Sequence, residues 1–220
     1  MNKKLKQCLE LIIVFIIICT IAAFSQTLVS MGNSLAVKMI IMLLIYIVMA
    51  FIPVMIYGVK KIPISNFGFK RQNIGKQLLF ALCIFVITII IFVILPLLIG
   101  MEKEDVLSFR ASRIVTKVFY IFYYLIFVGF GEELIFRGYY YNGIKDVTNS
   151  ELIAVILSSV VFGLWHYPGG QDIMQVIITF VIGLIFGIAR YKIKNCTLLS
   201  TSIAHGMHDA FIFILSCILL

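Results

Sequence analysis

The chain alternates long apolar stretches with short polar ones. The apolar stretches span roughly residues 9–29, 36–58, 77–100, 114–142, 151–167, 173–190 and 196–218. Each is close to the 17 to 25 or so residues that a helix needs to cross about 30 Å of hydrocarbon. The pattern therefore predicts an all-α fold, a polytopic membrane bundle of about seven transmembrane helices.

No internal repeat or long polar linker divides the chain, so residues 1–220 are predicted to form a single integral membrane domain. The first apolar stretch has an alternative interpretation as a signal peptide, because Lys3, Lys4 and Lys6 precede an apolar core that ends in small residues near Ala22. The core is long for a signal peptide and its cleavage site is poor. A retained first helix is favoured.

Composition supports the membrane interpretation, with 62% hydrophobic and 13% charged residues. Soluble domains have about 45–50% apolar and about 25% charged residues, so an ordinary water-soluble domain is excluded. The net charge of +8 comes from short basic clusters between apolar stretches, which does not fit a nucleic-acid surface. The five scattered cysteines predict neither a disulfide framework nor a cysteine-rich zinc site. The final residues 217–220 formally match a prenylation box, but are interpreted as the end of an apolar helix.

The basic residues also predict an orientation in the cell membrane. With a cytoplasmic N-terminus, 13 of the 18 lysines and arginines lie in cytoplasmic segments. The positive-inside rule then places the N-terminus in the cytoplasm and the C-terminus outside. The outer loop 101–117, which carries four basic residues, runs against this bias.

Ionisable residues cluster in spans four to seven, whereas the first three spans are almost purely apolar. The cluster comprises Glu132, Glu133, Arg137, His166, His205, His208 and Asp209. Such groups cost at least about 2.5 kcal/mol each at bilayer depth, and therefore face a bundle interior or a cavity and find partners. The chemistry is thus expected in the second half of the chain.

The paired glutamates are expected to have different roles. Glu133 and Arg137 are four residues apart with the acid first, which favours a helical ion pair. Glu132 points about 100° away and would be the free carboxylate, suited to accepting a proton. The alternative is a helix end with a solvated Glu–Arg pair.

Histidines mark the later spans. Phe162 and His166 share one helix face, although a single histidine at the end of a span is also typical of an interfacial position. His205, His208 and Asp209 are predicted to share another face, where a His–Asp hydrogen bond that only joins helices is the alternative. The small residues at 183 and 187 are interpreted as helix packing.

Together, Glu132-Glu133-x-x-x-Arg137, Phe162-x-x-x-His166 and His205-x-x-x-Asp209 resemble the motifs of the CAAX protease and bacteriocin-processing (CPBP, or Abi) family of intramembrane endopeptidases. The resemblance covers about residues 114–215, the predicted catalytic core. It implies that Glu132 activates a water with help from His166, and that His205 and Asp209 stabilise the oxyanion. Glu133, Arg137, Phe162 and His208 would then be supporting residues.

The last motif departs from the family, because many members have Asn where this chain has Asp209. An ionised Asp cannot donate a hydrogen bond to an oxyanion. It would have to be protonated, orient His205, or bind a metal. Glu132, His166, His205 and Asp209 form a candidate zinc set, although no His-Glu-x-x-His motif is present. The cofactor, zinc or none, stays open.

The function that the resemblance implies is hydrolysis of a peptide bond in a small membrane-associated peptide, of prenyl-type or bacteriocin-like character. The partners would be a peptide or membrane-anchored protein substrate and the lipid bilayer, without nucleic acid. A proton-coupled transporter is an alternative, since Glu, His and Asp also build proton relays, but inverted repeats are not evident. A non-catalytic bacteriocin-immunity protein of the same fold is a further alternative.

The proposed chemistry sets a geometric condition. If span four ended at Arg137, Glu132 would lie only about 8 Å deep, too shallow to meet His166 and His205. The helix is therefore predicted to continue to about residue 143 or later. Glu132, His166, His205 and Asp209 should converge on one cavity, with Glu133 facing away from it towards Arg137.

Overall fold

The computed structural model describes residues 2–220, and these contain helices but no strand. The helices are α1 (Lys3–Ser30), α2 (Leu35–Val59), the 3₁₀ turn η1 (Ile64–Phe67), α3 (Ile74–Ile89), η2 (Ile90–Ile94), α4 (Leu95–Leu98), α5 (Lys103–Val106), α6 (Ile114–Phe122), η3 (Tyr123–Val128), α7 (Gly129–Glu133), η4 (Leu134–Tyr140), α8 (Tyr141–Thr148), α9 (Glu151–His166), α10 (Ile173–Lys192) and α11 (Leu198–Leu219). The all-α prediction is confirmed.

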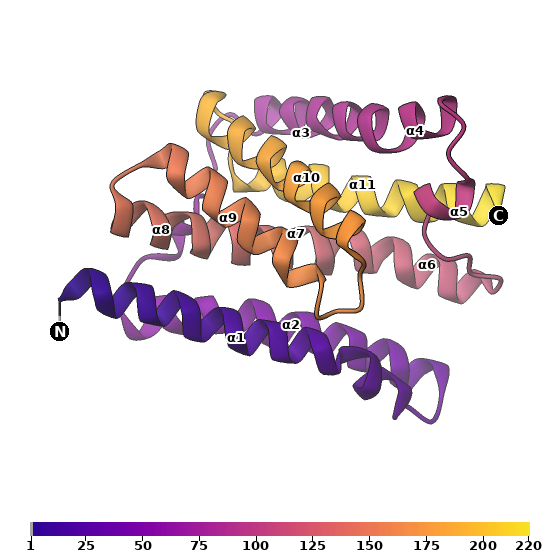
Figure 1. Cartoon of the computed structure of the whole chain (residues 1–220), viewed down its shortest axis with the longest axis horizontal. Coiled ribbons are helices and arrows are strands. Elements are labelled where there is room, and N and C mark those ends of the chain that lie inside the picture. The colour runs from indigo at the N-terminus through magenta and orange to yellow at the C-terminus, as the bar shows by residue number, and fades with distance from the viewer. Residues whose placement is uncertain (1) are drawn as a thin grey trace.

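Six helical stretches of the described residues are long and apolar enough to cross a membrane: Lys3–Ser30, Leu35–Val59, Ile74–Leu98, Ile114–Thr148, Ile173–Lys192 and Leu198–Leu219. The seventh predicted span is the shorter helix α9, whose 16 residues rise about 24 Å. The helices run back and forth along one direction, and the two termini lie at opposite ends of the bundle (Figure 1). This arrangement agrees with seven passes.

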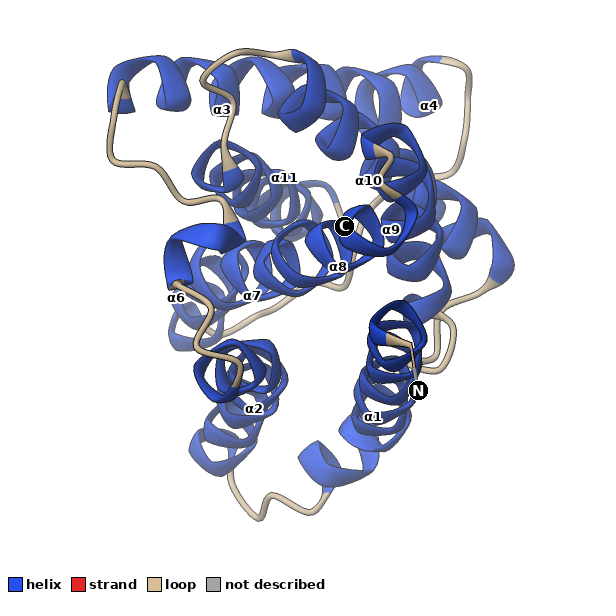
Figure 2. Ribbon diagram, turned by 90° about the vertical axis from the view of Figure 1, so that its left-hand side faces the viewer, coloured by secondary structure: helices blue, strands red, loops and turns tan. Residues whose placement is uncertain are grey.

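The helices form three layers (Figure 2). The segment α3–α4 lies on one side, α1 and α2 lie on the other, and the remaining long helices lie between them. Helix α11 is central to this middle layer and packs against both α3 and α7. A site built from the fourth to seventh spans is therefore covered on both sides.

Glycines bring the central helices close together. A Cβ atom on Gly129 would lie 2.6 Å from the backbone of Gly206 and Ser202, and one on Gly206 would lie 2.7 Å from the carbonyl of Leu125. Side chains as large as alanine do not fit at such a crossing, which brings α7 and α11 into backbone contact. The predicted packing role of Gly187 is also confirmed, because a Cβ there would lie 3.0 Å from Val155.

The helix that carries the paired glutamates continues from Ile114 to Thr148, as predicted. Two π-helical stretches, η3 and η4, flank the short α7 segment. Such π stretches are rare and are frequent at functional sites, because they change the direction of the side chains that follow. Arg137 lies inside this helix. The count of basic residues that predicted the orientation had placed it in a cytoplasmic segment.

Each end of the bundle is tied together by contacts between distant segments. At the end with the N-terminus, Lys60 Nζ lies 2.6 Å from Glu10 Oε2. The side-chain amide of Asn73 donates to Asn195 Oδ1 over 3.1 Å. At the opposite end, the Gln26 amide donates to the Gly169 carbonyl over 3.2 Å, and the Ser108 N–H donates to Ser216 over 2.9 Å. These contacts assign the loops that contain Lys60, Asn73 and Asn195 to one end, and those that contain Ser108 and Gly169 to the other.

Candidate active site

Glu132 lies on α7 in the centre of the bundle, with 2% of its surface exposed. Its Oε1 accepts a hydrogen bond of 2.7 Å from the hydroxyl of Tyr46 on α2. This contact was missed in the sequence, which placed all the chemistry in the second half. A tyrosine in an apolar span is the only signal that could have pointed to it.

Glu133 pairs with Arg137, as predicted, over 2.7 Å. Neither side chain is more than 1% exposed, so the alternative of a solvated pair at a helix end is wrong. The Arg137 guanidinium lies 4.2 Å from the Phe162 ring centre and 5.5 Å from that of Phe186. These aromatic faces offer favourable contacts to a cation that is far from water.

His205 lies between three carboxylates. Its Nδ1 is 3.2 Å from Glu133 Oε1, while its Nε2 is 3.6 Å from Glu132 Oε2 and 3.5 Å from Asp209 Oδ2. Glu133 therefore does not simply face away towards Arg137, as the sequence predicted, but also contacts His205. The close crossing of α7 and α11 causes this, since it places His205 beside both glutamates.

His166 approaches from the C-terminal end of α9. Its Nδ1 lies 2.8 Å from the carbonyl oxygen of Phe162 one turn earlier. A carbonyl only accepts, so this bond assigns the hydrogen to Nδ1 and leaves the Nε2 lone pair free in the neutral ring. The Phe162 and Trp165 rings contact the imidazole edge to face, at 4.8 and 5.0 Å between centres.

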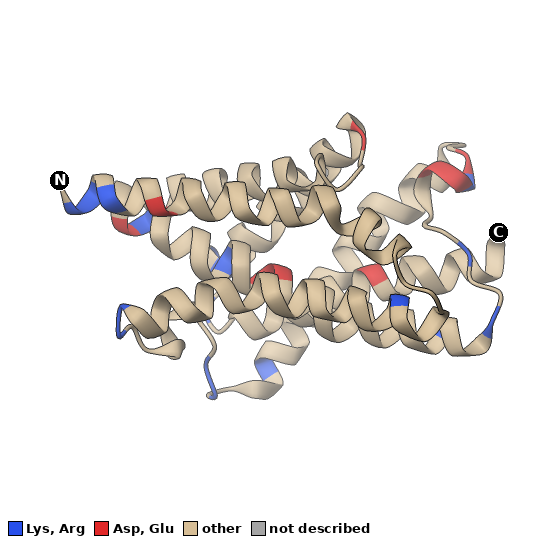
Figure 3. Cartoon of the chain, turned by 90° about the horizontal axis from the view of Figure 1, so that it is seen from below, with Lys and Arg blue, Asp and Glu red and all other residues tan. Residues whose placement is uncertain are grey.

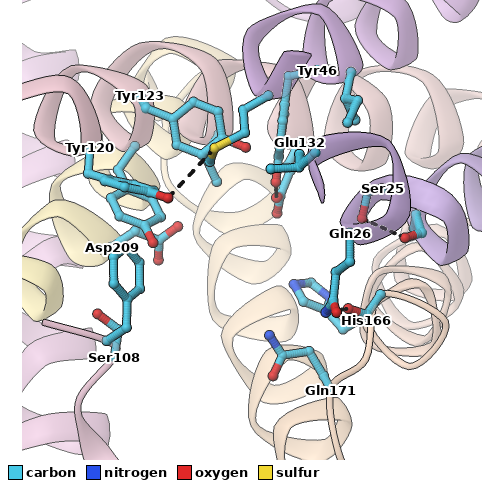
Figure 4. Close-up of a pocket in the computed structure, with 18 of the residues that line it drawn as sticks. Ser25, Gln26, Tyr46, Ser108, Tyr120, Tyr123, Glu132, His166, Gln171 and Asp209 are labelled. Carbon is cyan, nitrogen blue, oxygen red and sulfur yellow. Dashed lines mark hydrogen bonds between the residues drawn. The ribbon is translucent and has the colours of Figure 1, made fainter. Parts of the chain in front are cut away.

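A cavity of about 800 Å³ reaches this site, but His205, which was predicted to converge on it, is not among its lining residues. His205 instead contacts the lining residues Glu132 and Asp209. Glu132, His166 and Asp209 all line the cavity and point into it (Figure 4). The remaining lining is rich in hydroxyl and amide groups, including Ser25, Gln26, Tyr46, Ser108, Tyr120, Tyr123, Tyr124, Gln171, Gln175 and Thr179. Such a lining offers partners to the N–H and C=O groups of a peptide backbone.

His208 departs from the predicted arrangement. It is 3% exposed, lies edge to face with Phe92 of η2, and is not among the residues that line the cavity. The packing of α11 against η2 places His208 beside Phe92, whereas Asp209 lines the cavity. The prediction that His208 shares the face of Asp209 is wrong.

The candidate zinc set was tested against the geometry. Among residues 2–220, no group of three or more His, Cys, Asp or Glu side chains is placed so as to hold a metal ion. The four side chains as they lie do not fit a zinc centre.

Residues 114–211 match a family model described as type II CAAX prenyl endopeptidase Rce1-like. This segment, 98 of the 220 residues, is similar to the CAAX protease family. It contains all three motifs on which the resemblance rests, and the resemblance is confirmed. The similarity supports an intramembrane endopeptidase in general terms, and the apolar helices support a multi-pass membrane location. No curated protein and no solved structure matches the chain.

Proposed function

We propose that this CAAX-family protein hydrolyses peptide bonds of a small membrane-associated peptide by means of a water molecule activated by Glu132. The observation that carries the proposal is the position of Glu132. Its Oε2 lies beside His205 Nε2 at the wall of a cavity that His166 and Asp209 also line. A base, a donor and space for a peptide thus occur together.

In this mechanism, Glu132 takes a proton from the water while the water oxygen attacks the carbonyl carbon of the scissile bond. The neutral His166 ring, with its lone pair on Nε2, accepts a hydrogen bond from the same water and orients it. The C–N bond of the resulting tetrahedral intermediate then breaks, and the proton held by Glu132 passes to the departing amine. Neither step requires a covalent bond to the protein.

The negative charge that develops on the carbonyl oxygen needs a hydrogen-bond donor. We assign this role to His205 Nε2–H. Of the three options for Asp209, the distance of 3.5 Å to the same nitrogen supports the orienting one. Glu133, held by Arg137, would fix the other side of the ring through Nδ1.

The test is the cleavage of internally quenched peptides by purified protein in lipid nanodiscs. Glu132→Gln keeps the shape of the side chain but cannot act as a base, and a lost general base typically costs a factor of about 10²–10⁴. We expect a loss of at least about 100-fold with an unchanged unfolding transition. The control is Glu104→Gln, which removes an exposed carboxylate of α5 and should keep full activity. Full activity of Glu132→Gln would exclude the mechanism, and Glu132-dependent proton flux without cleavage would favour the transporter instead.

A further inference from the structure

The cavity lies towards one end of the bundle. The loop residues that line it belong to the segment 106–109 and to the turn 167–172, with Gly169 and Gln171 as lining residues of the turn. Both lie at the end opposite the N-terminus, because Gln26 near the end of α1 bonds Gly169, and Ser108 bonds Ser216 near the end of α11.

The helical residues of the lining agree with this direction. Helix α1 contributes residues 22–30 from its last turns, and α2 contributes residues 38–49 from its first half. The exposed residues Ser30, Lys38, Phe109 and Gln171 form the rim. At the other end, the described segments 60–73, 149–150 and 193–197 contribute nothing to the lining. Of the two ends of the bundle, the cavity therefore reaches the one that carries the C-terminus.

The same two ends differ in charge (Figure 3). After Arg137 is removed from the count, because it is buried in the site, the end with the N-terminus carries 12 basic residues: Lys3, Lys4, Lys6, Lys60, Lys61, Lys70, Arg71, Lys76, Lys145, Arg190, Lys192 and Lys194. The end with the cavity mouth carries five: Lys38, Lys103, Arg110, Arg113 and Lys117. Short loops near span ends that are rich in Lys and Arg stay in the cytoplasm.

We propose that the cavity opens on the extracytoplasmic side of the membrane, and that the substrate is a peptide segment exposed on that side. This inference rests on the proposed function for its substrate, and on the cavity and the charges for its direction. An exported peptide, or the outer end of a membrane-anchored one, reaches Glu132 through the rim at Lys38 and Gln171. A cytoplasmic C-terminal tail meets the closed end of the bundle.

The direction is tested with single added cysteines and a membrane-impermeant thiol reagent. Gln171→Cys reports on the rim, and Gln72→Cys is its matched control, an exposed glutamine in the loop at the opposite end. Both variants, and the parent chain with its own five cysteines as background, are labelled in right-side-out and in inverted vesicles. Labelling in detergent first establishes that each added thiol reacts, and Ser30→Cys replaces Gln171→Cys if it does not.

We expect Gln171→Cys to be labelled in right-side-out vesicles and Gln72→Cys in inverted ones. The reverse pattern, or labelling of both sites from the same side, would overturn the proposal. Internally quenched peptides added to the two preparations test the substrate, and Glu132-dependent cleavage is expected at the right-side-out surface. Cleavage confined to inverted vesicles would also overturn the proposal. Correct labelling without cleavage in either preparation would instead reject the proposed protease function and leave the direction of the cavity intact.

Discussion

The central helices and the N-terminal hairpin of α1 and α2 contribute to the site in different ways. Helix α11 buries 11 of its 22 residues, whereas α1 buries three of 28, at positions 14, 18 and 22. Helix α2 also buries three, at positions 49, 53 and 57. The hairpin therefore packs through one narrow stripe on each helix, while α11 is buried on several faces.

Because of this difference, substitutions in the two regions should affect different properties of the protein. The central helices are fixed by glycine crossings and by the buried Glu133–Arg137 pair, so changes there should affect folding. The hairpin forms a wall of the cavity and supplies the Tyr46 hydroxyl to Glu132, so a change there should affect turnover with little loss of stability. The family match, over residues 114–211, covers only the first of these regions.

The largest effect is expected from Glu133→Gln. This change leaves the Arg137 charge buried without its partner, which costs about 3–5 kcal/mol when one member of a buried pair is removed. The measurement is the free energy of unfolding in mixed micelles. Activity should fall together with the folded fraction.

The control for this prediction restores neutrality. In the double variant Glu133→Gln with Arg137→Met, no unpaired charge remains, and replacing a buried pair with uncharged groups is often close to neutral. We expect the double variant to recover most of the stability lost in the single one. A single variant as stable as the wild type would show that the pair does not hold the central helices together.

Much of this core could be predicted from the sequence, because hydrophobic length and helical spacing are local properties. They predicted the spans to within six residues at each end, the Glu133–Arg137 pair, and the continuation of the fourth helix past Arg137. The contact between Glu133 and His205 could not be predicted, since it depends on how closely α7 crosses α11.

The contact between the hairpin and the core could not be predicted from the sequence. Tyr46 stands in an apolar span, 86 residues away from Glu132, and no local period relates the two. The direction of His208 was predicted wrongly for a related reason, because its surroundings depend on the packing of α3 and η2 against α11. Tertiary contacts decided both positions.

An intermediate effect is expected from Tyr46→Phe. A hydrogen bond to a charged group contributes about 1.5–3 kcal/mol, so kcat should fall about tenfold or more when Glu132 loses its fixed orientation. KM and the unfolding transition should change little, because the ring and its contacts remain. Steady-state cleavage kinetics and thermal unfolding in micelles measure the two quantities.

Tyr140→Phe is the matched control for the hairpin. Its hydroxyl donates to the Leu11 carbonyl over 3.1 Å, so it also links the core to the N-terminal hairpin through a buried tyrosine. It does not line the cavity. We expect kcat to stay at the wild-type value in this variant. Equal losses of kcat in both variants would mean that Tyr46 acts only through packing.

The smallest effect is expected from Asp209→Asn, a change on α11 at the wall of the cavity. If Asp209 orients His205 by accepting from Nε2–H before the substrate binds, the Asn carbonyl oxygen can accept the same bond at that stage, and its NH₂ group adds a donor for the oxyanion. A neutral hydrogen bond replaces a charged one, a difference of about 1 kcal/mol, so activity should stay within about tenfold. Elemental analysis of both proteins should show no stoichiometric zinc, because the four side chains do not fit a zinc centre. A loss above about 100-fold, together with zinc that is present in the wild type and absent from the variant, would reverse the assignment and make Asp209 a metal ligand.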